Sequence, residues 1–222
     1  MNGTTRDEAT FGLGITQYFT GVPLSAAQYV TNITNTYSGN AGPGGTPPAY
    51  PAGTVDRVLA QYPLIAFPTP LLAADAAGSH TTACRARHLN QLLSEWVPVY
   101  AYEFVYQNAP YYFPPMPDFV ALAAHTIDIQ FLFPLWHGGP LGIVHPLNKA
   151  EEQLSDDLVD FWTDFARTGN PNGNRVKDHP WPRYRAAWDN YLAQDVATLS
   201  TYTGSQFSDI HKCWFWDTVL LY

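Results

Sequence analysis

Apolar residues recur at helical spacing between residues 149 and 168, and charged residues fill most of the positions between them. This pattern predicts an amphipathic helix whose apolar side packs on a core. Asn148 followed by Glu151 resembles a capping box, and Gly169 stands where a helix would end. The apolar side consists of Leu154, Leu158, Phe161, Trp162, Phe165 and Ala166. The other side carries four aspartates, which we interpret as a solvated helix face and not as metal ligands: Asp156, Asp157, Asp160 and Asp164.

The strongest strand signal is VPVYAYEFVY at residues 97–106, which is rich in Val, Tyr and Phe. It is apolar at both alternating sets of positions, which is typical of a parallel strand covered by helices on both faces. The Gly/Thr-rich residues 1–14 resemble a strand end that enters a loop. A buried parallel strand needs neighbours on both sides, and the chain offers only two or three weaker candidates. We therefore expect an α/β fold with an incomplete, mostly parallel sheet and covering helices.

Four further elements follow from capping and breaking residues. Ser25 is expected to cap one helix, and Ser208 is expected to cap a helix near the C-terminal end. Residues 71–95 predict a helical tract that Gly78 splits. The Gly/Pro-rich residues 38–53 predict a surface loop, because this composition sustains neither a helix nor a central strand.

Composition narrows the classes of function. The 222 residues suit one domain, with two small domains as the alternative. Charged residues make up 14% and hydrophobic residues 46%, which indicates a folded core and not disorder. A net charge of −8 without any basic cluster argues against nucleic acid as a partner. No apolar run reaches the roughly 20 residues of a membrane span, and the first residues lack the pattern of a secretory signal.

Motifs for metal, phosphate and nucleophile sites are missing from the sequence. There is no H-E-x-x-H, no zinc-like Cys/His spacing and no Gly-rich phosphate loop, so we expect neither a metal nor a cofactor. No G-x-S-x-G nucleophile elbow occurs. The run His137, Gly138 and Gly139 resembles an oxyanion loop but is interpreted as an ordinary turn.

Two segments nevertheless fit the other members of a Ser–acid–His triad. Glu8 lies in GTTRDEATF, just after an apparent strand end, and His125 lies in AAHTIDIQFLF. Acid before histidine is the order in which α/β-hydrolases present these residues. On composition alone, His125 would be a core histidine and Glu8 a surface carboxylate, and both alternatives stay open at this point.

Six segments together resemble one family. They are NGTTRDEATF, VPVYAYEF, AAHTIDIQFLF, FWTDFARTGNPNG, WPRY and HKCWFWDT. With this order and spacing, the chain resembles the C-terminal part of the type-B carboxylesterases and lipases, the family that includes cholinesterases. The resemblance implies an α/β-hydrolase fold with a triad of Ser, Glu and His.

Carried over by position, the resemblance makes Glu8 the triad acid and His125 the general base. Phe11 matches a position that often lines the substrate gorge. Thr126 stands where the family usually has glycine, and Asp128 matches a following acidic residue that is taken as structural.

The resemblance also implies a disulfide between Cys84 and Cys213, against the alternative of two buried free thiols. Ser79 replaces an aspartate that the family carries five residues before this first cysteine, which is expected to weaken a local hydrogen-bond network. A bridged parent protein is expected to be secreted or extracellular, whereas this chain's own location is not predicted.

We expect residues 1–222 to be the C-terminal part of a single domain whose N-terminal half, with the oxyanion loop and the nucleophile elbow, is absent. The complete enzyme is expected to hydrolyse a small-molecule carboxylic ester, with this chain supplying the acid and the base. Alone, the chain is expected to be inactive. The alternatives are a non-catalytic cholinesterase-like interaction domain and a truncated fragment without its own activity.

Overall fold

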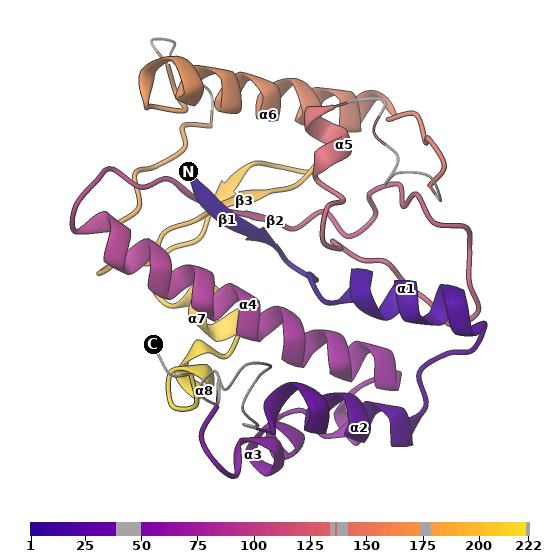
Figure 1. Cartoon of the computed structure of the whole chain (residues 1–222). Coiled ribbons are helices and arrows are strands. Elements are labelled where there is room, and N and C mark those ends of the chain that lie inside the picture. Colours follow the sequence, from indigo (N-terminus) through magenta and orange to yellow (C-terminus); the bar gives the residue numbers. More distant parts are fainter. Residues whose placement is uncertain (39–49, 134–135, 137–141, 174–178, 221–222) are drawn as a thin grey trace, which may run out of the picture.

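The computed structural model describes residues 1–38, 50–133, 136, 142–173 and 179–220. At its centre lies a four-stranded sheet in the order β1-β2-β3-β4 (Figure 1). The first two pairs are parallel and the β3–β4 pair is antiparallel. The strands are β1 (Asn2–Thr5), β2 (Ala101–Phe104), β3 (Leu192–Gln194) and β4 (Ser200–Thr201).

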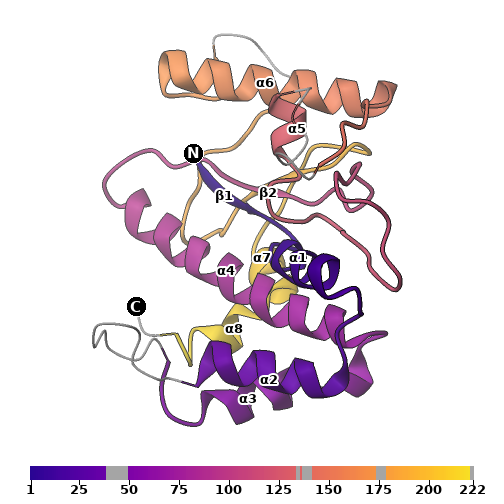
Figure 2. The same cartoon turned by 45° about the vertical axis from the view of Figure 1, so that its right-hand side comes forward.

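Helices cover both faces of this sheet. Figures 1 and 2 show α5 and α6 over one face and α4 with α7 over the other, while α2, α3 and α8 pack beyond α4. The helices are α1 (Thr10–Thr20), α2 (Ala26–Tyr37), α3 (Thr54–Gln61), α4 (Pro70–Ser94), α5 (Ile129–Leu132), α6 (Lys149–Thr168), α7 (Gln206–Ile210) and α8 (Cys213–Trp216), with a 3₁₀ turn at Leu64–Ala66. In the described part of the chain, no helix is both long and apolar enough to cross a membrane.

The side chains of β2 explain why both faces are buried. Tyr102 and Phe104 pack into the cluster beneath α6, whereas Ala101 packs on the α4 side with Phe207. The predicted burial of this strand on both faces is confirmed, although the ladder is shorter than residues 97–106. Gly3 of β1 is required at its position, because a Cβ there would lie 2.3 Å from the main-chain oxygen of Tyr102.

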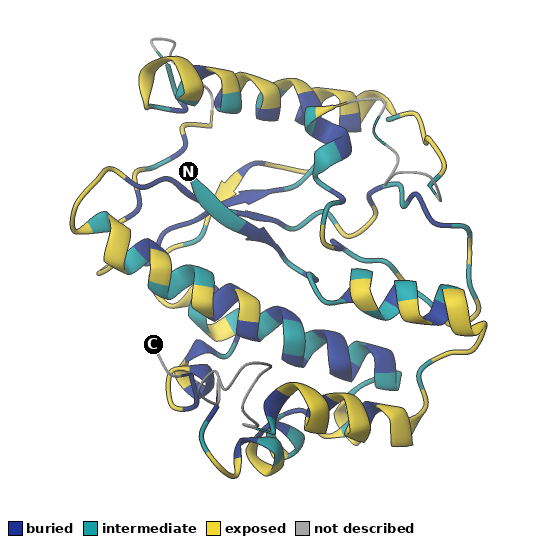
Figure 3. Cartoon of the chain, in the orientation of Figure 1, coloured by how far each residue is buried: buried dark blue, intermediate teal, exposed yellow. Residues whose placement is uncertain are grey.

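Helix α6 has the predicted bounds and caps. The Asn148 side chain accepts hydrogen bonds from the main chain of α6, and the Glu151 carboxylate accepts one from Asn148 N at 2.8 Å. Gly169 ends the helix at a φ of +73°. Figure 3 shows that the outward side of α6 is largely exposed. One of the four aspartates departs from the predicted solvated face, because Asp164 is buried and pairs with Arg167.

Of three local predictions about helices, the structure confirms one and corrects two. Ser25 caps α2 in a full capping box, as predicted. Gly78 does not split α4, and a Cβ added there would lie 2.7 Å from the Cβ of Ala9. The glycine therefore permits close packing of the chain on an unbroken helix. Ser208 is not a helix cap, since it lies inside α7 and donates to Asp189 at 2.7 Å.

Two predicted loops also need comment. The predicted loop after the first strand is wrong from Thr10 onward, because α1 begins there and runs to Thr20. The predicted surface loop of residues 38–53 lies mostly outside the described residues, as does the predicted turn of residues 137–139.

Cys84 of α4 and Cys213 at the start of α8 form a disulfide across 129 positions. The predicted bridge is confirmed, and the alternative of two free thiols is wrong. A second buried link lies nearby, where the His211 imidazole hydrogen-bonds the Glu103 carboxylate of β2 with both side chains almost fully buried. Together they attach the C-terminal helices to α4 and to the sheet.

Candidate active site

The site begins where β1 ends, at the carboxyl edge of the parallel strands, where α/β sheets commonly carry their reactive groups. The chain turns there through Asp7 and Glu8. The Asp7 carboxylate accepts from Ala123 N at 3.0 Å and from Gln107 Nε2 at 2.9 Å, and Asp7 bridges Ala124 in parallel. Asp7 thus joins the segment that carries Glu8 to the segment that carries His125.

Glu8 and His125 meet at this edge although 117 positions separate them. His125 Nδ1 lies 2.7 Å from Glu8 Oε2, and Thr5 N donates to Glu8 Oε1 at 3.1 Å. The His125 side chain is 54% exposed and that of Glu8 is 17% exposed. His125 is therefore not a core histidine, and Glu8 is not an isolated surface carboxylate.

This hydrogen bond makes Nδ1 the donor, because a carboxylate only accepts. A neutral ring that donates from Nδ1 to a carboxylate keeps a lone pair on Nε2, which can accept a proton from a reacting group. Among the described residues, no hydroxyl or thiol group hydrogen-bonds to the imidazole. Both cysteines of the chain are held in the disulfide.

A tight turn presents His125. Ile127 N donates to Ala124 O at 3.2 Å, which places Thr126 third in the turn with a φ of +69°. Glycine favours this left-handed region, and a β-branched residue pays about 1–2 kcal/mol there. Asp118 and Leu122, just upstream, also have positive φ values. Such strain persists only where surrounding contacts hold it.

Aromatic rings form a wall beside His125. Phe11, in the first turn of α1, lies with its ring centroid 5.5 Å from that of His125. Phe113 stacks behind Phe11 at 6.1 Å, and Tyr112 meets Phe11 edge-on at 6.3 Å. Phe11 therefore lies next to the imidazole, at the position that the sequence indicated for a substrate-lining residue.

Two further carboxyl groups accompany the pair, the half-buried Asp128 and the buried Asp75. The pKa of Asp128 is raised to about 6, chiefly by burial and next by the negative charge of Glu8, while His125 opposes the shift. Burial also raises the pKa of Asp75 in α4 to about 7, with Asp7 as the next cause. Sequence reasoning missed Asp75, whose signal was a lone acid in the apolar run PLLAADAAGS.

Ser79 does not leave this region without hydrogen bonds. Its hydroxyl donates to Asp75 Oδ1 at 2.7 Å and accepts from Ala9 N at 3.0 Å. The serine thus ties α4 to the residue after Glu8. The local network that the sequence predicted to be weakened is present here in a form built on Ser79 and Asp75.

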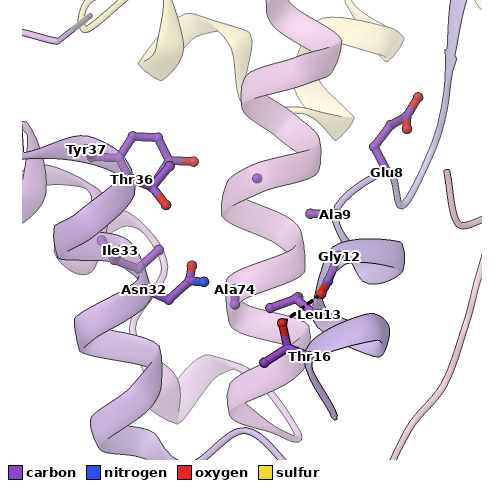
Figure 4. A pocket seen from close by; sticks show the side chains of 11 residues that line it. Glu8, Ala9, Gly12, Leu13, Thr16, Asn32, Ile33, Thr36, Tyr37 and Ala74 are labelled. Atoms are coloured by element: carbon purple, nitrogen blue, oxygen red, sulfur yellow. Dashed lines mark hydrogen bonds between the residues drawn. The ribbon is translucent and has the colours of Figure 1, made fainter. Parts of the chain in front are cut away.

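A pocket of about 370 Å³ lies between α1, α2 and α4 (Figure 4). Asn32 of α2 and Thr16 of α1 point into it, whereas Glu8 lies at its rim with the carboxylate turned away. His125 does not line this pocket, so it is separate from the space beside the imidazole. The described residues contain no group of three or more His, Cys, Asp or Glu that could hold a metal ion.

Comparison with known proteins identifies the family. Residues 73–216 match the model of the carboxylesterase family, and this range is more than half of the chain. The chain belongs to the carboxylesterase family. The matched range contains His125 and both bridged cysteines, whereas Glu8 and Phe11 precede it. The family has the α/β-hydrolase fold, with which the largely parallel sheet and its two helical layers agree.

Curated relatives support the same family. Carboxylesterase 4A of Bos taurus is 37% identical over 127 residues, which cover 57% of this chain and 20% of that protein. Carboxylesterase 5A of Mus musculus is 36% identical over 128 residues, which cover 55% and 20%. Acetylcholinesterase of Bungarus fasciatus is 29% identical over 147 residues, which cover 66% and 22%. This carboxylesterase-family chain thus spans about a fifth of the length of the relatives that it matches.

Proposed function

We propose that Glu8 and His125 are the acid and the general base of a Ser–Glu–His triad that hydrolyses small-molecule carboxylic esters. The hydrogen bond of 2.7 Å between His125 Nδ1 and the Glu8 carboxylate carries this proposal. The nucleophilic serine and the oxyanion donors come from another stretch of the same α/β-hydrolase domain. Phe11 flanks the acyl or alcohol part of the ester.

The reaction proceeds in two steps, acylation and deacylation of the serine. The serine oxygen attacks the ester carbonyl while Nε2 of His125 takes the serine proton, and this proton passes to the leaving alkoxide as the ester C–O bond breaks. Water then attacks the acyl-serine in the same way, which releases the carboxylic acid and restores the serine. Glu8 keeps the Nδ1 proton in place and stabilises the imidazolium that forms in each step.

Two neighbouring features support the proposal that the rest of the domain docks on this chain. Among the described strands, β1 pairs only with β2, so its other edge carries no ladder. Asn2 of β1 donates to the main-chain oxygen of Ala86 in α4. Leu89, Leu93 and Trp96 follow Ala86 at helical spacing and are exposed, with Trp96 85% exposed. An additional strand along β1 would cover this apolar stripe as well.

The disulfide supports a parent protein that matures in an oxidising compartment, such as the secretory route. A non-catalytic cholinesterase-like interaction domain is the second candidate. The intact pairing of Glu8 and His125 favours the esterase, because an interaction domain has no need of an oriented imidazole.

Hydrolysis of short p-nitrophenyl esters tests the proposal. The chain alone should show negligible turnover, and the chain co-expressed with the N-terminal half of a close relative should gain it. Glu8→Gln and His125→Ala should abolish the gained turnover, whereas the matched control His145→Ala, at an exposed histidine outside the site, should leave it unchanged. Turnover that survives His125→Ala would refute the assignment of the base.

A further inference from the structure

Thr126 adopts an unfavourable backbone conformation directly beside the imidazole. It is third in the turn after Ala124, at a φ of +69°, where glycine is the favoured residue. A β-branched side chain is a genuine outlier in this region. The turn that presents His125 therefore needs contacts from outside itself.

The outside contact comes from Tyr112 and reaches the turn through the Thr126 hydroxyl. Thr126 Oγ1 donates to the main-chain oxygen of His125 at 2.5 Å, and Thr126 Oγ1 also lies 2.8 Å from the hydroxyl oxygen of Tyr112. A hydroxyl has one hydrogen to donate, so Tyr112 must be the donor in the second bond. The result is a series of two hydrogen bonds, from the Tyr112 hydroxyl to the Thr126 hydroxyl and from there to the main-chain oxygen of His125.

Tyr112, the first donor of this series, is held in place by its surroundings. The residue is 3% exposed, and its ring meets that of Trp136 edge-on at 5.0 Å and that of Phe11 edge-on at 6.3 Å. The Tyr112 main-chain oxygen also accepts from Ile143 N at 2.9 Å. The imidazole itself is half exposed and has only the Glu8 carboxylate as a hydrogen-bond partner among the described residues.

We propose that Tyr112 and Thr126 are positioning residues, whose paired hydroxyls hold the His125 turn so that Nδ1 faces Glu8. A ring with one side-chain hydrogen bond keeps its orientation only if its backbone is held in place. The hydroxyl pair supplies this support at a position where the resemblance leads us to expect glycine. The role of His125 as a general base rests on the proposed function. The orientation of its ring toward Glu8 does not depend on that function.

The ¹⁵N shifts of the His125 ring nitrogens test the proposal without any hydrolysis. At about pH 9, where an imidazole is neutral, these shifts report the ratio of the Nδ1–H to the Nε2–H tautomer. The full chain should show mainly the Nδ1–H form, and Glu8→Gln assigns the effect to the carboxylate. Tyr112→Phe and Thr126→Val should each lower the tautomer ratio by about threefold or more, as expected when one hydrogen bond's net contribution is lost.

Two variants separate positioning from general damage. Thr126→Ser keeps the hydroxyl and should retain the wild-type tautomer ratio. Tyr111→Phe removes a buried hydroxyl of the same aromatic cluster that has no partner among the described residues, and it should leave the ratio unchanged.

The proposal is overturned if Tyr112→Phe keeps the wild-type ratio, or if Tyr111→Phe lowers it equally. Tyr112→Phe preserves the ring and its packing, so this variant stays informative even if Thr126→Val fails to fold. A changed ratio in a chain that never gains esterase activity would support the positioning role and count against the proposed function alone.

Discussion

Removal of the Cys84–Cys213 bridge should cost this chain a large part of its stability. The bridge closes a loop across 129 positions. In the chain-entropy model, a loop of this length lowers the entropy of the unfolded chain by an amount equivalent to about 5 kcal/mol at 25 °C. Domains are typically stable by only about 5–15 kcal/mol. Cys84→Ala with Cys213→Ala should therefore bring the folded state close to its limit.

Equilibrium urea unfolding of the oxidised chain and the double variant measures this loss. The unbridged unfolded chain is more expanded, so the dependence of the unfolding free energy on urea should also become steeper. The reduced wild-type chain, which keeps both sulfur atoms, separates the loop constraint from lost packing. A loss below about 1 kcal/mol with an unchanged urea dependence would refute the loop argument.

Three further changes probe other parts of the molecule. The pKa of Asp75 is raised from 3.8 to about 7, so between pH 3.8 and 7 the folded state retains a proton that the unfolded state releases. The free energy of unfolding should therefore fall by up to about 4 kcal/mol as the pH rises through this range, and stay level above it. Urea unfolding at several pH values should lose this pH dependence in Asp75→Asn and keep it in the exposed control Asp156→Asn. Gly169→Ala should cost about 1 kcal/mol in thermal unfolding, because its φ is +73° and a Cβ meets no neighbour. His211→Leu should lower the free energy of unfolding by about 3–5 kcal/mol in urea, because Glu103 is then buried without His211. The double variant His211→Leu with Glu103→Leu should be more stable than His211→Leu alone.

Local signals in the sequence were sufficient wherever the determinants of an element lie within a few residues of each other. The bounds of α6 follow from Asn148, Glu151 and Gly169, which act on the helix ends directly. Gly78 carried the same breaking signal as Gly169 but lies inside an unbroken helix, because the close approach of Ala9 decides its role. Ser208 likewise serves a distant partner, Asp189, which no local pattern reveals.

The candidate site shows the same division. The order of Glu8 and His125 was visible in the sequence, and the resemblance gave them roles, but their contact depends on the parallel bridge between the neighbouring residues Asp7 and Ala124. Asp75 and the hydroxyl of Tyr112 were not predicted. Asp75 is important because it is buried, and Tyr112 because its hydroxyl contacts Thr126. Neither property produces a pattern of spacing in the sequence.

The topology of the sheet also sets an order of events during synthesis. Asn2 pairs with Ala101, 99 positions on (101 − 2), and Tyr102 pairs with Leu192, 90 positions on (192 − 102). Helix α4 is synthesised before β2 and β3, so Ala83 of α4 at first lacks its later neighbours Ala101, Tyr191 and Phe207. Non-local pairing of this kind folds slowly and exposes apolar surface in the meantime. The core between α4 and the sheet is therefore complete only after Phe207 has been synthesised.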